Sequence, residues 1–195
     1  PGALAYGLAD FSGGLATRRA PVFRVTAVVQ LAGLVALLPA VPLAGGAPSW
    51  AAVGWGVFAA AAGTGGLLLY LRALAVGPMG VVAPLSAVVG AGLPLLVGLV
   101  GGERLGPVTL VAIGIALVAI VMATAGGAPG TGSRLGPVMA LGAGAGFALF
   151  FVGLHASPAG SGMWPLLVGR LASVPALIVV AALTCGVRTG TGFPW

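Results

Sequence analysis

The stretch that decides the fold is LRALAVGPMGVVAPLSAVVGAGLPLLVGLVGGERLGPVTLVAIGIALVAIVMAT, residues 71–124. It contains most of two apolar runs, 79–101 and 107–125, which are divided by the turn sequence GGERLGP. Each run has about the 20 residues that a helix needs to cross a bilayer. Because every backbone polar group must be paired inside hydrocarbon, an apolar run of this length predicts a transmembrane helix.

Further apolar runs lie on both sides of this stretch. They cover 2–17, 25–44, 51–71, 136–155 and 165–185. The breaks between the runs are short and rich in Gly, Pro and Arg, which mark turns. The short alternating segments of a transmembrane barrel are not seen. We therefore expect an all-α integral membrane protein with about seven transmembrane helices.

The composition agrees with a polytopic membrane protein. Of the 195 residues, 59% are hydrophobic and 5% are charged, whereas soluble domains carry about 25% charged residues. The net charge of +6 comes entirely from arginine. Since the arginines flank apolar runs, where charges set membrane topology, nucleic acid is not an expected partner. The chain starts at Pro1 beside one run and ends in GFPW just past another, so we expect a fragment of a longer protein.

Arginines also predict the orientation of the chain. If successive spans cross the membrane in opposite directions, Arg104 and Arg170 lie on one side of it. Six others lie on the opposite side: Arg18, Arg19, Arg24, Arg72, Arg134 and Arg188. The positive-inside rule then makes the loops after the first, third, fifth and seventh spans cytoplasmic. The expected location is the inner (plasma) membrane, which the chain crosses several times.

A weak internal repeat is visible. VVQLAGL at 28–34 matches VGRLASV at 168–174 at several positions and pairs Gln30 with Arg170. The preceding helices align roughly and pair Asp10 with Leu149. An odd number of helices separates the copies, so the second copy is inverted in the membrane, as in many secondary transporters. Shared membrane composition is the alternative explanation for the match.

The opening stretch also resembles the EamA-like branch of the drug/metabolite transporter superfamily. The resemblance rests on Ala73-Leu74, the turn from Gly77 to Gly80, Pro84, Pro94, the turn from Gly102 to Leu105, and Gly114. It implies ten helices in two inverted five-helix halves. Residues 1–125 would be the first repeat, 126–135 the loop between repeats, and 136–195 the first two helices of the second repeat. It also implies export or exchange of small metabolites, amino acids or drugs around a central cavity.

Asp10 is one of only two acidic residues in the chain and lies within an apolar run. A charged carboxylate at the centre of a membrane costs about 2.5–3.5 kcal/mol on insertion scales. Ala9-Asp10, Gly13 and Arg18 resemble the first helix of the small multidrug resistance proteins, in which the acid is Glu. We hypothesise that Asp10 faces the cavity and holds either a proton or a cationic solute. The alternative is a protonated residue that only supports packing, because many EamA-like proteins have no acid here.

The remaining cavity or substrate candidates share a polar, aromatic or helix-breaking character. They are Gln30, Trp55, Thr64, Tyr70, Pro84, Ser86, Pro94 and Arg170. The two prolines are expected to interrupt the fourth helix and free carbonyl groups beside a binding site. Trp55 and Tyr70 line the cavity or belong to the interfacial aromatic belt, where Trp50 is expected. Arg170 contacts an anionic solute group or extends to the membrane surface.

Glu103 and Arg104 form a separate turn motif just before Gly106-Pro107. An acidic residue is favoured there by the N-terminus of the next helix. The turn is either a solvated local ion pair or a gating contact.

No catalytic site, metal site or cofactor is expected. The single Cys185 excludes an internal disulfide, and paired carboxylates are lacking. GAPGTGS at 127–133 lacks the Lys of a phosphate-binding loop, and His155 with Ser161 has no nucleophile motif around it. The favoured function is a secondary transporter of small organic solutes. The alternatives are a flippase subunit or an enzyme acting on a lipid-linked substrate, and a structural subunit. Expected partners are a small-molecule substrate and membrane lipids, with a homodimer left open.

Overall fold

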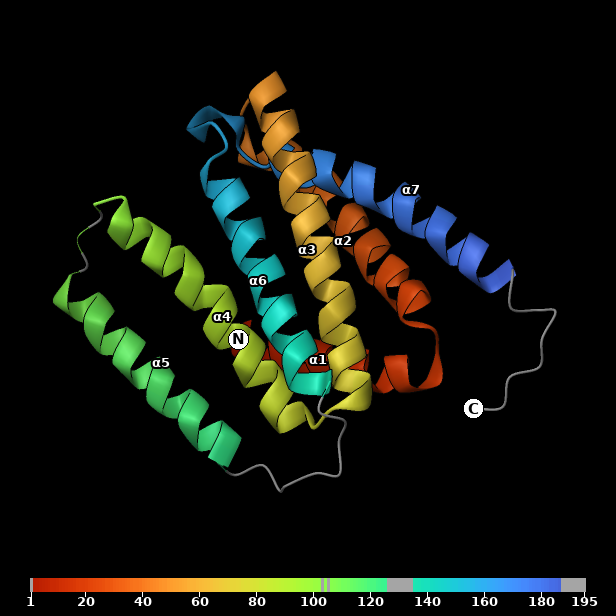
Figure 1. The fold of residues 1–195 in the computed structure, drawn as a ribbon. Coiled ribbons are helices and arrows are strands. Elements are labelled where there is room, and N and C mark those ends of the chain that lie inside the picture. The colour runs from red at the N-terminus through yellow and green to blue at the C-terminus, as the bar shows by residue number, and fades with distance from the viewer. Residues whose placement is uncertain (1, 103, 105, 126–134, 187–195) are drawn as a thin grey trace.

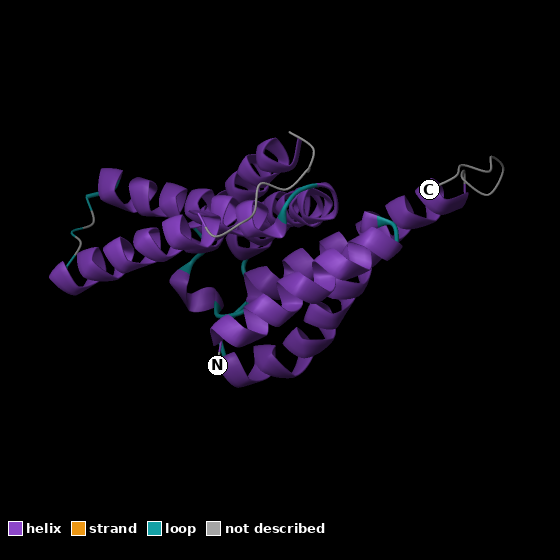
Figure 2. Cartoon of the chain, turned by 90° about the horizontal axis from the view of Figure 1, so that it is seen from below, coloured by secondary structure: helices purple, strands orange, loops and turns teal. Residues whose placement is uncertain are grey.

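The computed structural model describes residues 2–102, 104, 106–125 and 135–186. Its long helices are α1 (Gly2–Arg19), α2 (Val22–Ala44), α3 (Trp50–Val76), α4 (Met79–Val100), α5 (Pro107–Ala125), α6 (Leu135–His155) and α7 (Trp164–Gly186). A short 3₁₀ helix, η1 (Ala159–Ser161), precedes α7. The seven apolar runs are thus seven helices, and the prediction of an all-α membrane protein is confirmed (Figures 1 and 2).

Within the part of the chain that the structure describes, five helices are long and apolar enough to cross a membrane. These segments are Val22–Ala44, Trp50–Val76, Gly80–Val100, Leu135–His155 and Trp164–Leu183. In α5 the apolar segment Pro107–Ile120 is shorter than these. The helix α1 is not among them, because its 18 residues include Asp10, Arg18 and Arg19. The most polar helix of the chain is therefore the one that carries Asp10.

Local sequence explains where the helices begin and end. The Ser49 hydroxyl accepts a hydrogen bond from the Ala52 N–H at 3.1 Å and caps α3, as N-cap serines do. Pro107 is the first residue of α5, where a missing N–H does no harm. The expectation that Pro84 and Pro94 interrupt the fourth helix is wrong, because α4 runs continuously from Met79 to Val100 through both. Transmembrane helices tolerate prolines where neighbouring groups pair the freed carbonyls.

The helices α3 and α6 form the central pair of the bundle (Figure 1). Glycines allow their backbones to approach closely. A Cβ atom on Gly146 would lie 2.7 Å from the Cα of Gly66 and 2.8 Å from the carbonyl oxygen of Ala62. On the other side of α6, a Cβ on Gly144 would lie 2.6 Å from the Cβ of Val89 on α4. The glycine content of the chain thus serves a tightly packed core.

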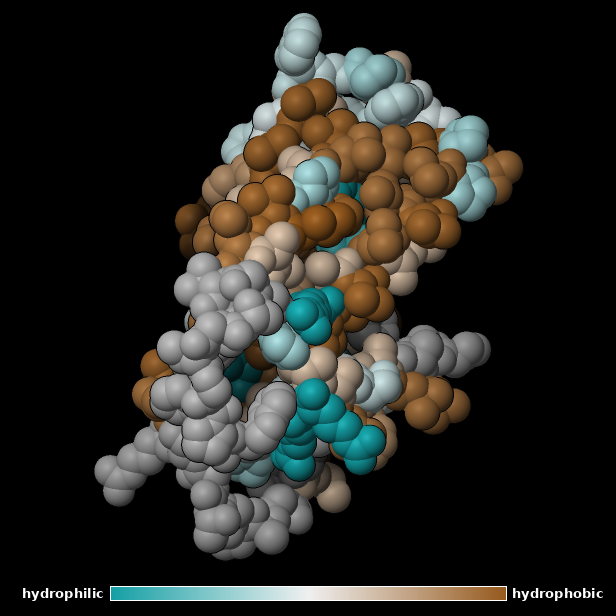
Figure 3. Space-filling view, turned by 90° about the vertical axis from the view of Figure 1, so that its right-hand side faces the viewer, coloured by the Kyte–Doolittle hydropathy of each residue, from teal (hydrophilic) through white to brown (hydrophobic). Residues whose placement is uncertain are grey.

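The other helices surround this pair. The helix α4 packs on α6, α7 and α2 pack on α3 and on each other, and α1 packs mainly on α3. The helix α5 contacts α4 at the edge of the molecule (Figure 1). The buried core lies where α3, α4 and α6 meet, with Tyr70, Leu71, Ala73, Leu74, Val82, Ala140 and Ala143. Large apolar side chains cover much of the outer surface (Figure 3), as expected for contact with lipid.

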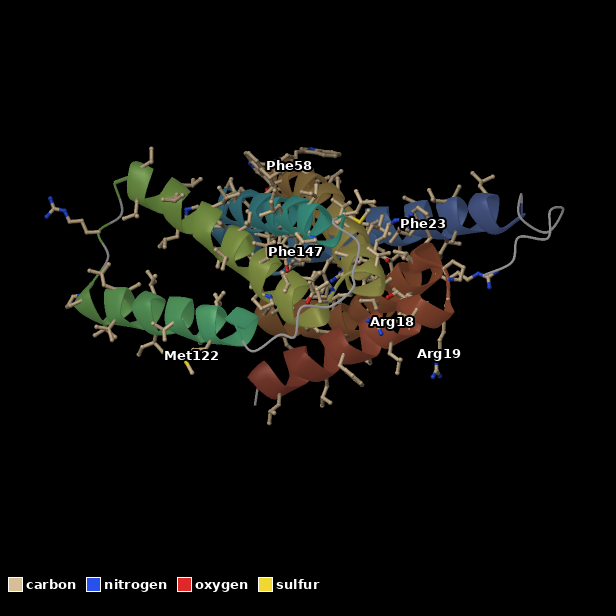
Figure 4. The ribbon with its side chains drawn as sticks, turned by 60° about the horizontal axis from the view of Figure 1, so that its bottom comes forward. Arg18, Arg19, Phe23, Phe58, Met122 and Phe147 are labelled. Carbon is tan, nitrogen blue, oxygen red and sulfur yellow. The ribbon has the colours of Figure 1, made fainter. Side chains whose placement is uncertain are left out.

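Basic residues gather at one end of the bundle. The Thr17 hydroxyl donates to the Leu71 carbonyl at 3.3 Å, which holds the last turn of α1 beside the end of α3. Arg18 and Arg19, which are labelled in Figure 4, therefore lie at the same end as Arg72, the residue after Leu71. This placement agrees with the expectation that these three arginines lie on the same side of the membrane. Two other arginines of that set, Arg134 and Arg188, lie outside the described residues.

Candidate functional site

Asp10 lies against α3, where it meets Tyr70. The Tyr70 hydroxyl donates a hydrogen bond to the Asp10 carboxylate. Tyr70 is only 7% exposed, and its ring packs edge-on against Phe147 of α6 (labelled in Figure 4), with the ring centroids 5.8 Å apart. Asp10 itself is half-buried. The structure thus brings together two residues predicted as site candidates, on helices α1 and α3.

The contact between α1 and α3 is close along the turns that follow Asp10. A Cβ on Gly13 would lie 3.1 Å from the Cδ2 of Leu71, and the Thr17 hydroxyl bonds to the carbonyl of the same residue. Because these contacts hold the end of α1 in place, they also set the direction from which the Asp10 side chain meets Tyr70.

A second polar group joins α2, α3 and α7. The side-chain amide of Gln30 donates to the Thr64 hydroxyl at 2.8 Å and to the Ser173 hydroxyl at 3.2 Å. Gln30 is 4% exposed and Ser173 is 8% exposed, so the bonds lie between the helices. Buried polar groups are costly unless they are hydrogen-bonded, and here the three side chains satisfy one another in part. We call Gln30, Thr64, Ser173 and Arg170 the polar layer.

Arg170 completes the polar layer from α7. Its side chain lies against Gly33, whose Cβ, if present, would be 3.2 Å from the guanidinium carbon. Gly33 is the central residue of α2 (Val22–Ala44). No hydrogen bond or ion pair joins the guanidinium to a residue that the structure describes. The described part of the chain has one acidic residue, Asp10, and that residue meets Tyr70 instead.

The other candidates do not join these two groups. Trp55 is 40% exposed and packs edge-on against Phe58 at the edge of the bundle (Figure 4). Ser86 is 3% exposed, but its hydroxyl bonds to the Ala83 carbonyl of its own helix at 3.0 Å. Pro84 and Pro94 are half-buried on α4. These residues contribute to packing and have no visible link to the polar layer or to Asp10.

The turn motif is only partly visible. Glu103 lies outside the described residues. Arg104 is exposed at the turn between α4 and α5, and the preceding Gly102 has a φ of 88°, a left-handed conformation that favours glycine.

The loops α2–α3 and α6–α7 interlock at the end of the bundle opposite to the basic residues. The Ala47 N–H donates to the Gly160 carbonyl at 3.1 Å, and the indole N–H of Trp164 donates to the Gly46 carbonyl at 3.3 Å. A Cβ on Gly162 would collide with the carbonyl oxygen of Gly45. The two loops therefore close this end backbone to backbone.

An apolar groove of about 300 Å³ lies beside these loops. Its lining residues are Leu38, Val41, Pro42, Gly45, Gly46, Trp164 and Leu167. None of the predicted site residues lines it. In the part of the chain that the structure describes, no three His, Cys, Asp or Glu side chains come together as metal ligands would.

Sequence reasoning missed Gly33, Phe147 and Ser173. For Ser173 a signal existed, since it lies three residues after Arg170 on the same helical face. The repeat also pairs Gly33 with Ser173. Phe147 had no signal, because an aromatic residue in an apolar helix is indistinguishable from its neighbours until α6 is placed beside Tyr70.

Comparison with known families gives a match over the first part of the chain. The sequence profile of the EamA-like transporter family matches residues 2–125. No curated protein and no solved structure matches the chain.

Proposed function

The chain belongs to the EamA-like transporter family, whose members carry small solutes across membranes, and from this premise we propose that it is a secondary active exporter or exchanger. It would move small organic solutes across the inner membrane by alternating access. The observation that carries the proposal is the Asp10–Tyr70 pair, which places a hydrogen-bonded carboxylate between helices of an apolar bundle.

The pair supports a role for Asp10 in coupling solute to protons. An intramembrane carboxylate that faces other helices is expected to serve a function, because its charge is expensive in hydrocarbon. The Tyr70 hydroxyl stabilises the charged form by donating to it. A proton or a cationic group of the solute would neutralise the same carboxylate. Since both cannot occupy it together, binding of one releases the other.

Contacts between α2 and α7 support two halves related by the repeat. Gln30 of α2 bonds to Ser173 of α7, while Arg170 of α7 lies against Gly33 of α2. The repeat pairs Gln30 with Arg170 and Gly33 with Ser173. When each residue is replaced by its partner in the repeat, the Gln30–Ser173 contact becomes the Arg170–Gly33 contact. A two-fold axis between two helices requires such reciprocal contacts. We therefore propose that residues 1–125 form the first repeat and 136–195 begin the second.

The interlocked loops support a gate at one end. The α2–α3 loop belongs to the proposed first repeat and the α6–α7 loop to the second. Alternating access would require the Ala47–Gly160 hydrogen bond and the Trp164–Gly46 hydrogen bond to break when this end opens. With both bonds formed, this end would be closed. The basic residues at the opposite end would lie in the cytoplasm by the positive-inside rule, so the closed end would face outward.

Reconstitution tests the proposal. Purified protein in phosphatidylcholine vesicles that contain a pH-sensitive dye would be challenged with a panel of organic cations. Cation-driven proton movement in the wild type that is lost in Asp10→Asn is the expected result. Proton movement that is equal in both proteins would overturn the coupling role. Movement of headgroup-labelled lipid without solute transport would instead favour the flippase alternative.

A further inference from the structure

We propose that the polar layer binds one oxyanion of the transported solute, a carboxylate, with Arg170 as its main partner. This proposal rests on the proposed transport function in one respect: it takes the carboxylate to belong to a transported solute. The site is formed by α2, α3 and α7 and is separate from the Asp10–Tyr70 pair on α1 and α3.

The position of the Arg170 guanidinium argues for a binding role. An arginine near the end of a membrane helix usually extends its side chain to the water interface. Here the guanidinium lies over Gly33, the central residue of α2. A charge at that depth is costly on every scale, and no acidic side chain among the described residues offsets it. A Cβ at this point of α2 would lie 3.2 Å from the guanidinium carbon, a tight contact that glycine avoids.

The hydrogen bonds of the layer leave donors without acceptors. Four other Ser and Thr hydroxyls in the helices donate to a carbonyl of their own helix: Ser12, Thr17, Thr26 and Ser86. Thr64 and Ser173 accept from the Gln30 amide instead. In this orientation of the Gln30 amide, their own hydroxyl hydrogens have no acceptor among the described residues. Arginine adds five N–H donors and no acceptor. A site with an excess of donors and a positive charge fits an oxyanion.

The side chains of the layer lie close together on facing helices. Arg170 and Ser173 are three residues apart on α7 and so lie on one helical face. Gln30 and Gly33 have the same spacing on the facing helix α2. The guanidinium matches the two oxygens of a carboxylate in a paired geometry, and the hydroxyls of Ser173 and Thr64 would donate from the side. Lipid phosphates lie at the membrane surface, about 15 Å from the midplane, so a solute carboxylate fits the depth better.

Chemical modification of Arg170 tests the site without knowledge of the solute. Phenylglyoxal would be reacted with the purified protein in phosphatidylcholine nanodiscs, and modification of Arg170 and of exposed Arg104 would be measured by peptide mass spectrometry. Acetate is the probe, and acetamide and chloride at equal ionic strength are the controls. At about ten times its Kd, acetate should slow modification of Arg170 about tenfold and leave Arg104 unchanged. Equal Arg170 rates in acetate and acetamide would overturn the proposal.

Two further experiments show which groups protect Arg170: the first removes the hydroxyl donors, and the second supplies an anionic lipid. Thr64→Val and Ser173→Ala keep Arg170 but remove the hydroxyl donors, and should weaken protection by acetate. Unchanged protection would overturn the inclusion of the hydroxyls. Nanodiscs with added phosphatidylglycerol test the lipid source, and protection by that lipid in the absence of acetate would overturn a solute carboxylate as the ligand. Since protection requires no transport, its loss is distinguishable from a failure of proton coupling at Asp10.

Discussion

Tyr70 of α3 donates a hydrogen bond to Asp10 of α1, although sixty positions of the chain separate them. The bond turns the one acidic side chain of the described helices toward protein rather than lipid. It also connects Asp10 to the core, because the ring of Tyr70 packs on Phe147 of α6. Movement of α1 relative to α3 would therefore change the environment of the carboxylate, as a coupling residue requires.

Asp10→Asn should abolish cation-driven proton movement in proteoliposomes, because the amide neither binds nor releases a proton. Asp10→Glu keeps the carboxyl group and should retain part of the activity. Binding of an organic cation, measured by fluorescence or calorimetry, should weaken in Asp10→Asn and lose its dependence on pH. Binding that stays pH-dependent in this variant would show that another group is responsible.

Tyr70→Phe removes one hydroxyl and leaves the ring against Phe147. The carboxylate then lacks a donor that stabilises its charged form, a bond worth about 1.5–3 kcal/mol. The midpoint of cation-driven proton release should move to more alkaline pH, because Asp10 holds its proton more tightly. A pH titration of the dye signal checks this shift. A shift to acidic pH would contradict the proposed direction of the hydrogen bond.

Gly66→Ala should destabilise the central helix pair. The added Cβ would lie 3.0 Å from the Ala143 carbonyl oxygen and 3.2 Å from the Cα of Gly146, and overpacking of this kind costs about 1–3 kcal/mol. The neighbouring Gly65→Ala is the matched control, because nothing lies within 4 Å of its Cβ. Thermal unfolding in detergent should show a lower Tm for Gly66→Ala only. Equal Tm values would mean that α3 and α6 are farther apart than described.

Gly162→Ala should open the gate between the two loops. Its φ of 53° is unfavourable for alanine, and the Cβ would collide with the Gly45 carbonyl. Gly160→Ala is the control, since its Cβ meets nothing within 4 Å. A cysteine at Ala47 should react faster with a membrane-impermeant maleimide in the Gly162→Ala background. The same rate in both backgrounds would show that the loops do not form the gate.

The sequence by itself determined the fold class and the helices. Apolar runs of bilayer length can only be helices, since no water is present to pair their backbone groups, and the expected ranges agree with α1 to α7. It also singled out Asp10 as a candidate, because a charge within an apolar run is costly wherever that helix packs. The match of residues 2–125 to the family agrees with the resemblance seen in residues 71–124.

Only the tertiary structure decided which candidates belong together. Tyr70 and Trp55 looked alike in the sequence, yet one meets Asp10 and the other faces outward. Ser86 looked like a cavity residue, but its own helix satisfies it, whereas Ser173 was overlooked and meets Gln30. The physical reason is that nearly every face of these helices is apolar, so hydrophobic periodicity cannot show which face is buried. In this chain that information lies in the close contacts of glycines such as Gly33 and Gly66, and these exist only after the helices have packed.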